Sequence, residues 1–447
     1  MTRVRSAPTP HLPKRPRPSA GSANAPRPER IGPKRRQEFR VSNRQVAVTG
    51  LGLVTSAGSS TPAVWETVCA GRSVATRDPA LAGLPIDFSC QVSDFDAAAE
   101  LGGRTSRRLD RFGHLGLAAA RRAVDDAGLS PDRWPAERVG VVLGVSSNSL
   151  EGYAREFSML GGGRSGAVSP LALPRSIPSL LAGEVAIDLG ARGPNFVVTS
   201  ACASGTTAIG VARDLIRSGT CDIVLTGGSE SPRAPMNATC FTQMRALARG
   251  DSRPELASRP FDVSRDGLVL GEGAAVLVLE STTHARARGA RVRAYVRGYG
   301  ASADAHHPTA PHPGGRGAEQ ALRAALADAG CAPGDVDHVS AHGTGTLLGD
   351  AVEADALLRV FGTPPPVTAV KSVIGHAMGA AGAIAAAIAV LTMEQQTVPP
   401  TANLVEQEPG RELDIPTGLP RRVPMEAAVV NAFGFGGQNS VLLLTLP

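Results

Sequence analysis

The stretch Asn195-Phe-Val-Val-Thr-Ser-Ala-Cys202 carries the clearest indication of how this chain folds. It has the pattern of a buried strand that ends in small residues, and the sequence after it predicts a helix from about Ser204 to Ile216. A second stretch, Val367-Thr-Ala-Val-Lys-Ser-Val-Ile-Gly-His376, leads into another helix rich in Ala and Gly. Each consists of a strand, a tight turn, one reactive side chain and a helix, which indicates a weak internal repeat. Two such halves meeting face to face would place both reactive side chains at neighbouring helix N-termini.

The rest of the chain alternates between apolar runs that predict strands and segments that predict helices. Strands are predicted at 45–52, 138–144, 221–228, 274–280, 291–297, 336–341, 367–371, 427–440 and 441–446, and helices at 115–127, 318–329, 350–360 and 377–391. This alternation implies an α/β protein with mainly parallel sheets between layers of helices. A chain of 447 residues is too long for one small core, so we expect two globular units or one duplicated unit.

The positive charge of the chain comes from its N-terminal segment. Residues 1–43 hold 11 Lys and Arg, two Glu and eight Pro, with almost no large apolar side chains. Such a segment cannot bury enough surface to offset its ordering entropy, so we expect a disordered, basic, Pro/Arg-rich extension, either solvated or in contact with an acidic partner. Without it the net charge of +6 becomes −3, from 35 Lys and Arg against 38 Asp and Glu. The body therefore does not have the charge of a nucleic-acid binder.

The cysteines and the apolar segments indicate a reducing, membrane-free environment. The six cysteines form no C-x-x-C pair and show no zinc-ligand spacing, so we expect no metal site and free thiols in the cytoplasm. The N-terminus lacks the apolar core of a signal peptide. Residues 377–393 are uncharged but short and weakly apolar for a membrane span, and a buried central helix is the better interpretation.

Cys202 is the first candidate catalytic residue. It lies between a predicted strand and a helix N-terminus, where N–H groups and the helix dipole favour the thiolate and would lower the pKa of the thiol. Its small neighbours Ala201, Ala203 and Gly205 leave room for an acyl thioester. The alternative is an inert core thiol, since free cysteines are mostly buried.

Two histidines are the next candidates. His342, in Ala341-His-Gly-Thr-Gly-Thr346, would lie at the C-terminal edge of a strand, where α/β proteins form their sites, although a core histidine satisfied by the backbone fits the same pattern. His376 precedes a helix whose N-terminus disfavours an imidazolium, so we expect a neutral ring that can donate a hydrogen bond. Lys371, five residues earlier, could be a buried ion-pair partner of Glu353.

A glycine-rich stretch near the C-terminus, Asn431-Ala-Phe-Gly-Phe-Gly-Gly-Gln-Asn439, is the fourth motif. Its alternating glycines free a backbone N–H to point into a site, which is what the oxyanion of a thioester intermediate needs. Taken alone, the stretch is also compatible with an ordinary glycine loop.

Together these four motifs resemble those of the elongating β-ketoacyl synthases of the thiolase superfamily, the group of KAS II-like enzymes and type II polyketide ketosynthases. The resemblance extends from about Gln45 to Leu446 and includes Arg259-Pro-Phe-Asp and Val269-Leu-Gly-Glu-Gly. It implies a thiolase-like fold, in which duplicated βαβ halves form a five-layered α-β-α-β-α sandwich. The N-terminal half would span 44–295 and carry the nucleophilic cysteine, and the C-terminal half would span 296–447 and carry both catalytic histidines.

The resemblance also implies a role for each residue in the decarboxylative condensation of an acyl thioester with malonyl-acyl carrier protein. Cys202 would accept the acyl chain, and His342 and His376 would promote decarboxylation and hold the enolate oxygen. The backbone N–H groups of Cys202 and Phe435 would bind the thioester oxyanion. Lys371 would orient the site through Glu353, and the Phe435 side chain would act as a gate.

The partner implied by the resemblance is an acyl carrier protein, which would carry the phosphopantetheine arm, so that the enzyme itself would need no cofactor. Thr344 and Thr346 would line the tunnel for this arm, with Thr309 at its mouth. Carrier proteins are acidic, and the positions that match the family's docking patch are all basic here. These positions are Arg104, Arg107, Arg108 and Arg245.

Several positions depart from the commonest fatty-acid-synthase pattern. Leu347 replaces a Pro, Ser179 an Asn and Gln438 a Thr, and the loop Ala305-His-His-Pro-Thr-Ala-Pro-His312 is unusually rich in His. With the basic extension, these departures favour the catalytic ketosynthase of a type II polyketide system, and a housekeeping fatty-acid KAS II is the alternative. We expect a homodimer, or a heterodimer with a homologous chain-length-factor subunit.

Three other readings of the sequence are disfavoured. A non-catalytic chain-length-factor-like subunit would lack the nucleophile, which this chain retains. A nicotinamide oxidoreductase is suggested only by Gly50-Leu-Gly52, since Thr55 replaces the third glycine of the phosphate-binding pattern. A serine hydrolase would need a G-x-S-x-G motif at a strand–helix turn, and none is present.

Overall fold

The computed structural model describes residues 45–147, 150–250 and 253–447. They belong to one unit, Val41–Pro447, so the two predicted halves are parts of a single body. The predicted basic extension at 1–43 lies outside the described residues.

Each half of the chain builds a five-stranded sheet with the same strand order. In the N-terminal half the order is β5 (Asn195–Val198), β4 (Val139–Gly144), β6 (Ile223–Glu230), β7 (Gly273–Ser281) and β1 (Val46–Thr55). In the C-terminal half it is β10 (Val367–Thr368), β9 (His338–Ser340), β13 (Ala427–Gly434), β14 (Gln438–Thr445) and β8 (Ala294–Ala303). Numbered within its own half, each sheet therefore has the order 3-2-4-5-1, and the predicted internal repeat is confirmed. The predicted boundary at 295/296 falls two residues into β8, the first strand of the second half.

The two sheets meet through a short antiparallel pairing of β1 with β8, in which Ala47 faces Tyr295 and Val48 faces Ala294. Both sheets are mixed, so the prediction of mainly parallel sheets is wrong. In each half the first three strands of the order are parallel to one another, and the last two pairings are antiparallel. In the C-terminal half the cause is local, because only three residues join β13 to β14 and so tight a connection reverses the chain.

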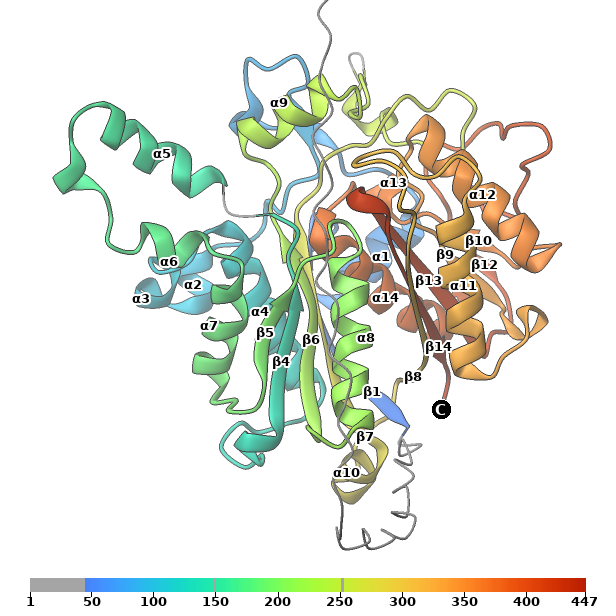
Figure 1. Cartoon of the computed structure of the whole chain (residues 1–447), viewed down its shortest axis with the longest axis horizontal. Coiled ribbons are helices and arrows are strands. Elements are labelled where there is room, and N and C mark those ends of the chain that lie inside the picture. Colours follow the sequence, from blue (N-terminus) through green and yellow to red (C-terminus); the bar gives the residue numbers. More distant parts are fainter. Residues whose placement is uncertain (1–44, 148–149, 251–252) are drawn as a thin grey trace, which may run out of the picture. The chain divides into compact units, whose positions relative to one another are not determined.

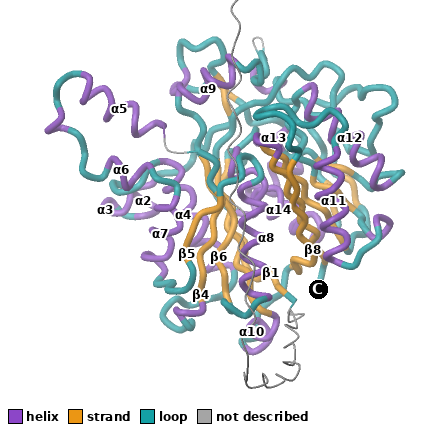
Figure 2. Tube along the Cα trace, in the orientation of Figure 1, coloured by secondary structure: helices purple, strands orange, loops and turns teal. Residues whose placement is uncertain are grey.

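Helices separate and cover the sheets to give five layers (Figure 1). The helices α8 (Ser204–Arg217) and α14 (Met378–Gln395) form the middle layer, and they pack against each other and against β6. On the outer side of the N-terminal sheet lie α4 (Arg111–Asp126) and α7 (Ser179–Leu189), and on the outer side of the C-terminal sheet lies α11 (Arg316–Ala329), which packs against α12 (Leu347–Phe361). Figure 2 shows the strands as two groups with α8 between them. Three hydrophobic clusters correspond to the middle layer and the two outer ones, which confirms the predicted sandwich.

The helix α14 is long and apolar enough to cross a membrane, but 89% of it is buried inside the protein. Small side chains make this burial possible, since Ala and Gly dominate its sequence and let the sheets approach closely. The prediction of a buried central helix is therefore confirmed.

Shorter elements lie in the connections. The helices are α1 (Thr61–Ala70), α2 (Ala97–Leu101), α3 (Gly103–Ser106), α5 (Leu150–Gly161), α6 (Ala172–Ser176), α9 (Pro235–Gln243), α10 (Thr282–Ala287) and α13 (Lys371–Ile374). The strands are β2 (Thr76–Arg77), β3 (Phe88–Ser89), β11 (Thr397–Val398) and β12 (Arg421–Arg422). The predicted strand at 367–371 ends at Thr368, and Lys371 begins the one-turn helix α13 instead.

The repeat positions the two reactive side chains in equivalent ways. Cys202 lies two residues before the first residue of α8, and His376 lies two residues before the first residue of α14. The strands that lead to them, β5 and β10, occupy the same outer place in their sheets. Because α8 and α14 are in contact, the fold brings the two helix N-termini together in the middle of the protein.

Candidate active site

A cavity of about 110 Å³ lies where these helices begin. Cys202, His342 and His376 all line it, so the structure brings together the three residues that the sequence analysis selected. Phe435 and the three predicted tunnel residues, Thr309, Thr344 and Thr346, line the same cavity.

Cys202 lies on a strained turn that is crossed by the glycine loop after β13. Ala201 has φ 49°, a left-handed conformation that a side chain disfavours. A Cβ atom added to Gly434 would lie 2.9 Å from the backbone N of Cys202, so only glycine permits this close approach. The backbone N–H groups of Phe435 and of Cys202 itself both donate to the Cys202 sulfur. Two N–H groups thus converge where a thioester oxyanion would form.

The thiol of Cys202 is less acidic than the sequence analysis expected. Burial raises its pKa to about 11, and the nearby Glu230 carboxylate acts in the same direction. The Lys371 ammonium and the two backbone N–H groups lower the pKa, but they offset the burial only in part. The prediction of a lowered pKa is therefore wrong. The free energy lost when the thiolate is removed from water is larger than the stabilisation that the N–H groups at the helix N-terminus and one buried cation provide.

The two histidines are held as neutral rings. Burial lowers the pKa of both imidazoles well below the ordinary value, and the Lys371 ammonium lowers both further. Their rings lie edge to face with centroids 5.5 Å apart. The Nδ1 atom of His376 accepts a hydrogen bond from the backbone N–H of Met378 at 3.2 Å, which leaves the proton of the neutral ring on Nε2.

Lys371 and Glu353 hold the loop that carries His342 from two sides. The Lys371 ammonium donates to the carbonyl oxygen of His342 at 2.6 Å. The Glu353 carboxylate accepts from the backbone N–H groups of His342 and Gly343, each at 2.8 Å, and from the Asn431 side chain at 3.0 Å. Both side chains are buried. Lys371 and Glu353 therefore do not form the expected direct ion pair. Instead, both side chains form hydrogen bonds to the backbone of His342.

Burial also tunes the charges of these two supports. It lowers the pKa of Lys371 to about 8, although Glu353, Cys202 and Asp350 raise it. It raises the pKa of Glu353, against the effect of the N–H and amide groups that Glu353 accepts from.

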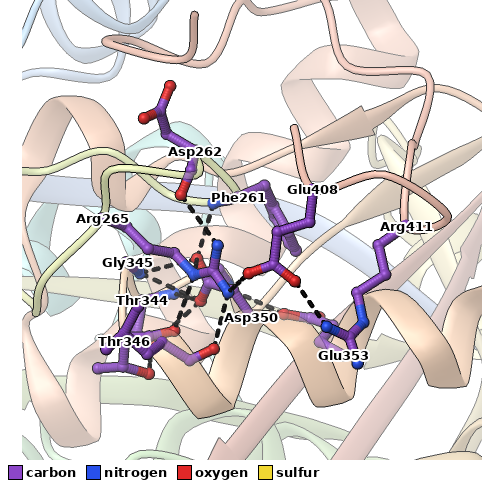
Figure 3. Close-up of polar contacts among 12 residues, drawn as sticks. Phe261, Asp262, Arg265, Thr344, Gly345, Thr346, Asp350, Glu353, Glu408 and Arg411 are labelled. Carbon is purple, nitrogen blue, oxygen red and sulfur yellow. Dashed lines mark hydrogen bonds and ion pairs between the residues drawn. The ribbon is translucent and has the colours of Figure 1, made fainter. Parts of the chain in front are cut away.

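Asp350 supports the next turn of the same loop (Figure 3). Its buried carboxylate accepts from the backbone N–H groups of Thr344, Gly345 and Phe261, at 3.0, 3.1 and 2.7 Å. Burial raises the pKa of this carboxyl to about 6. Arg265 lies beside it and donates to the Glu408 carboxylate at 2.6 Å and to the carbonyl oxygen of Leu347 at 2.7 Å. This frame fixes the backbone of Thr344 and Thr346 beside the cavity.

Two functional supports, Asp350 and Glu230, were missed by the sequence analysis. Glu230 ends β6, and its buried carboxylate accepts from the backbone N–H of Ser146 at 2.6 Å and from that of Gly379 in the first turn of α14 at 3.3 Å. Burial raises the pKa of this carboxyl. A signal was present in the sequence for Glu230, which is the one acidic residue in the apolar and glycine-rich stretch 223–232, where a charge needs a structural partner.

The predicted docking arginines are not equivalent in the structure. Arg104, Arg107 and Arg245 are exposed. Arg108 instead donates to the buried carboxylate of Glu184 at 2.7 Å, so its charge is already paired within the protein. Within the described ranges, no group of three His, Cys, Asp or Glu side chains is arranged to hold a metal ion.

A cysteine on a helix N-terminus, two neutral imidazoles facing it across a cavity and two converging backbone N–H groups define a condensing acyltransferase of the thiolase-like fold. The family model described as "Beta-ketoacyl synthase, N-terminal domain" matches residues 43–285, and the model of the C-terminal domain matches residues 293–405. The chain therefore belongs to the β-ketoacyl synthase family.

Individual relatives agree with this assignment. The chain is 37% identical to a 3-oxoacyl-[acyl-carrier-protein] synthase 2 of Staphylococcus aureus (strain COL) over 90% of its own length and 98% of the relative. Its structure is similar to the ishigamide ketosynthase/chain length factor, with a TM-score of 0.85, 36% identity and coverage of 90% and 99% of the two chains. It is also similar to a type II polyketide ketosynthase solved with its acyl-carrier protein, with a TM-score of 0.82, 30% identity and coverage of 90% and 99%.

The pKa of Cys202 leads to a testable prediction on its alkylation by iodoacetamide. Since only the thiolate reacts, the rate should be slow at pH 7 and rise about tenfold for each pH unit below the pKa of about 11. The Lys371 ammonium, with a pKa of about 8, stabilises the thiolate below that pH. Lys371→Met should therefore slow alkylation at pH 7 and have a smaller effect at pH 9.

Site-resolved mass spectrometry of the modified peptide measures this rate for Cys202 alone, and Cys202→Ser is the control that removes the signal. Rapid alkylation at pH 7 that is insensitive to Lys371→Met would contradict the raised pKa.

Proposed function

We propose that this enzyme condenses an acyl group held on Cys202 with a malonyl unit carried by an acyl carrier protein, as the catalytic ketosynthase of a type II polyketide system. The single observation that carries the residue roles is that Cys202, His342 and His376 line one cavity, with the N–H groups of Cys202 and Phe435 on the sulfur. No other cluster in the described part of the chain combines a nucleophile with neutral donors in this way.

In the first half-reaction the Cys202 sulfur attacks the carbonyl carbon of the carrier's acyl thioester. A new bond forms between carbon and the Cys202 sulfur, the old carbon–sulfur bond breaks, and the proton of the Cys202 thiol ends on the released carrier thiol. The Lys371 ammonium stabilises the thiolate on the way, and the converging N–H groups stabilise the tetrahedral oxyanion.

In the second half-reaction malonyl carrier enters the same cavity. The bond to its carboxylate breaks, CO₂ leaves, and the electron pair forms an enolate whose oxygen accepts hydrogen bonds from His342 and His376. Neutral imidazoles suit this task, because a ring N–H donates without a charge that would have to be desolvated. The enolate carbon then attacks the carbonyl carbon of the Cys202 thioester, and the bond between that carbon and the Cys202 sulfur breaks. The Cys202 thiolate is thereby regenerated, and the 3-oxoacyl product remains on the carrier.

No resident cofactor is required in this scheme, because the carrier brings its own phosphopantetheine arm. The tunnel residues support such an arm. Thr344 and Thr346 bond to each other through their hydroxyls at 2.9 Å and line the cavity with Thr309. Arg245 lies at the rim of this cavity, because its neighbour Ala246 is a lining residue. Hydrogen bonds connect this segment to the threonine loop: the carbonyl oxygen of Ala246 accepts from the N–H of Leu268, and that of Gly345 accepts from the N–H of Gly267.

The polyketide assignment is supported by the similarity to type II ketosynthases and by the departures at Leu347, Ser179 and Gln438. These three residues are the first of α12, α7 and β14, and none of them is among the residues that line the cavity with Cys202. A housekeeping fatty-acid KAS II is the alternative, since the 3-oxoacyl-[acyl-carrier-protein] synthase 2 of Staphylococcus aureus is 37% identical to the chain and the type II polyketide ketosynthase is 30% identical. A chain-length-factor role is disfavoured because the chain keeps Cys202 and both histidines.

The function is tested by separating the two half-reactions. Cys202 should become acylated by an acyl carrier thioester, and malonyl carrier should then release CO₂ and a 3-oxoacyl product. His376→Ala should still form the acyl-enzyme but lower decarboxylation about 10²–10³-fold, because one donor to the enolate is lost. Mass spectrometry of the Cys202 peptide and release of labelled CO₂ measure the two steps.

In this experiment Cys202→Ser is the control for the first step. An acyl group found on another residue, or full decarboxylation by His376→Ala, would refute the assignment of roles. Addition of several malonyl units without a reducing enzyme would favour the polyketide system, and a single addition the fatty-acid system.

Docking of an acidic carrier is proposed at the exposed arginines Arg104, Arg107 and Arg245. Reversing Arg107 and Arg245 to Glu should raise the KM for acyl carrier protein at least about tenfold, because like charges then face each other at the rim, and leave the KM for pantetheine thioesters unchanged. Steady-state kinetics with the two substrate types measures the difference.

The contrasting variant is Arg108→Glu, which breaks the ion pair with buried Glu184 and should lower activity with both substrate types through the fold. Equal loss on both substrate types in the Arg107 and Arg245 variants would remove the case for docking there.

We further propose that the chain works as a dimer, either with a second copy or with a homologous chain-length-factor subunit, joined through β5. The two equivalent outer strands, β5 and β10, differ in whether another segment of the chain bonds to their outer edge. β10 is covered by the segment 399–416, through hydrogen bonds such as that from Val367 N–H to the Asp414 carbonyl at 2.8 Å. β5 is an edge strand within the described part of the sheet, and its Phe196 is 37% exposed. The helix α7, which packs against β5, also exposes a large apolar side chain, Ile187.

Light scattering of the unchanged chain, alone and mixed with a homologous Cys-less subunit, should reveal a dimer in one of the two samples. Phe196→Lys should weaken it, because the edge strand would then bury a charge at the junction. Leu419→Lys, at an exposed apolar residue away from β5, is the control. A monodisperse monomer with full activity would contradict the proposal.

A further inference from the structure

The histidine-rich loop between β8 and α11 is a feature that the condensation chemistry does not use. His306, His307 and His312 lie on it, and the ring of His306 is 6.5 Å from that of His307 and 5.1 Å from that of His312, centroid to centroid. The loop begins after Ala303 and ends at Arg316, the first residue of α11. Three imidazoles so close together on an exposed loop indicate a common ligand.

The loop forms the outer end of the cavity that contains Cys202. Asp304, Thr309, Pro311 and Gly315 line that cavity, and the histidines alternate with them along the chain. The loop is also tied to the glycine loop of Phe435, because the N–H of Gly436 donates to the carbonyl oxygen of Pro308 at 2.7 Å. The three imidazoles therefore lie on the loop that forms this end of the cavity, and none of them is among the residues that line the cavity itself.

Two of the rings use Nδ1 to hold their own loop. The Nδ1 atom of His307 accepts from the backbone N–H groups of Thr309 and Ala310, at 3.2 and 3.1 Å. The Nδ1 atom of His312 accepts from the N–H of Gly314 at 3.0 Å. In a neutral ring with Nδ1 as acceptor, the proton is on Nε2, on the opposite side of the ring from the loop backbone. Both rings thus offer an N–H donor outward.

This arrangement suits an anion better than a metal ion. A metal ion would need ring lone pairs, and the two Nδ1 lone pairs are already occupied by backbone N–H groups, whereas Nε2–H can only donate. Arg316, which is exposed, adds a full positive charge at the start of α11. The Asp304 carboxylate is engaged within the protein, because it accepts hydrogen bonds from the His312 backbone N–H at 2.9 Å and from the Asn439 side chain at 2.8 Å.

We propose that His306, His307, His312 and Arg316 form a binding site for the phosphate group of the phosphopantetheine arm. This inference rests on the proposed function, because that function brings the arm into the tunnel. The arm is uncharged along its pantetheine part and carries its negative charge at the phosphate, which remains at the mouth while the thioester reaches Cys202. Donors at the mouth therefore recognise the phosphate and set the depth to which the arm enters.

The test compares the binding of 4′-phosphopantetheine and pantetheine by isothermal titration calorimetry. The unchanged protein should bind the phosphorylated compound about tenfold or more tightly, since hydrogen bonds to a charged group are the strong ones. Changing all three histidines to Asn should abolish this preference and leave pantetheine binding unchanged, because the Asn side-chain oxygen can replace Nδ1 as acceptor for the loop while the outward donor is lost. Arg323→Gln, further along α11, is the matched control and should keep the preference.

Acyl transfer to Cys202 from the corresponding acyl thioesters provides a second readout, in which the triple variant should raise KM for the phosphorylated substrate alone. Equal binding of the two compounds by the unchanged protein, or an unchanged preference in the triple variant, would overturn the proposal. So would an effect seen only with intact carrier protein, which would mean that the loop binds acidic side chains. Failure of any thioester to acylate Cys202 would instead refute the proposed function and leave the calorimetric result to decide this site.

Discussion

The close contact between α8 and α14 is the constraint on which the rest of the structure depends. A Cβ atom added to Gly205 of α8 would lie 2.7 Å from the backbone N of Ala383 in α14, so the helices touch through their backbones. The contact is possible only because both helices present small residues to each other. It sets two helix N-termini side by side between the sheets, and each terminus is preceded by one of the reactive side chains, Cys202 and His376. Without it the two duplicated halves would each carry half of a site.

Burial then decides the electrostatics of that site, and it acts in opposite directions on its members. It keeps the imidazoles of His342 and His376 neutral, which suits them to donate hydrogen bonds, but it also makes the Cys202 thiol a weaker acid. A single buried ammonium, Lys371, opposes the effect of burial on the thiol, since it favours the thiolate, and reinforces the effect of burial on the two imidazoles, since it disfavours the imidazolium. The carbonyl oxygen of His342 accepts from this ammonium, so the loop that carries the His342 ring also positions the charge, on α13, that acts on the thiol and on both rings.

Much of this arrangement could be predicted from the sequence, and the failures have a common cause. Strand and helix positions, the internal repeat and the grouping of Cys202 with two histidines follow from local patterns and motif order. The directions of the last two strands in each sheet do not, because they depend on how the chain turns between elements. The raised pKa of Cys202, the pairing of Arg108 with Glu184 and the separate contacts of Lys371 and Glu353 likewise depend on neighbours distant in sequence, which one motif cannot reveal. Asp350 and Glu230 were overlooked for the same reason.

The unequal cover of the two outer strands has a consequence for how large an assembly this protein can build. A protein with two bare strand edges can add copies at both ends and grow into a fibre. Here the segment 399–416 closes one edge of the described ten-stranded sheet by bonding to β10, and β5 is the edge of that sheet that remains open. An association through one bare edge uses that edge up on both partners, so growth stops at two. Had the second half left its edge uncovered, the repeated strand order would offer two edges for association in place of one.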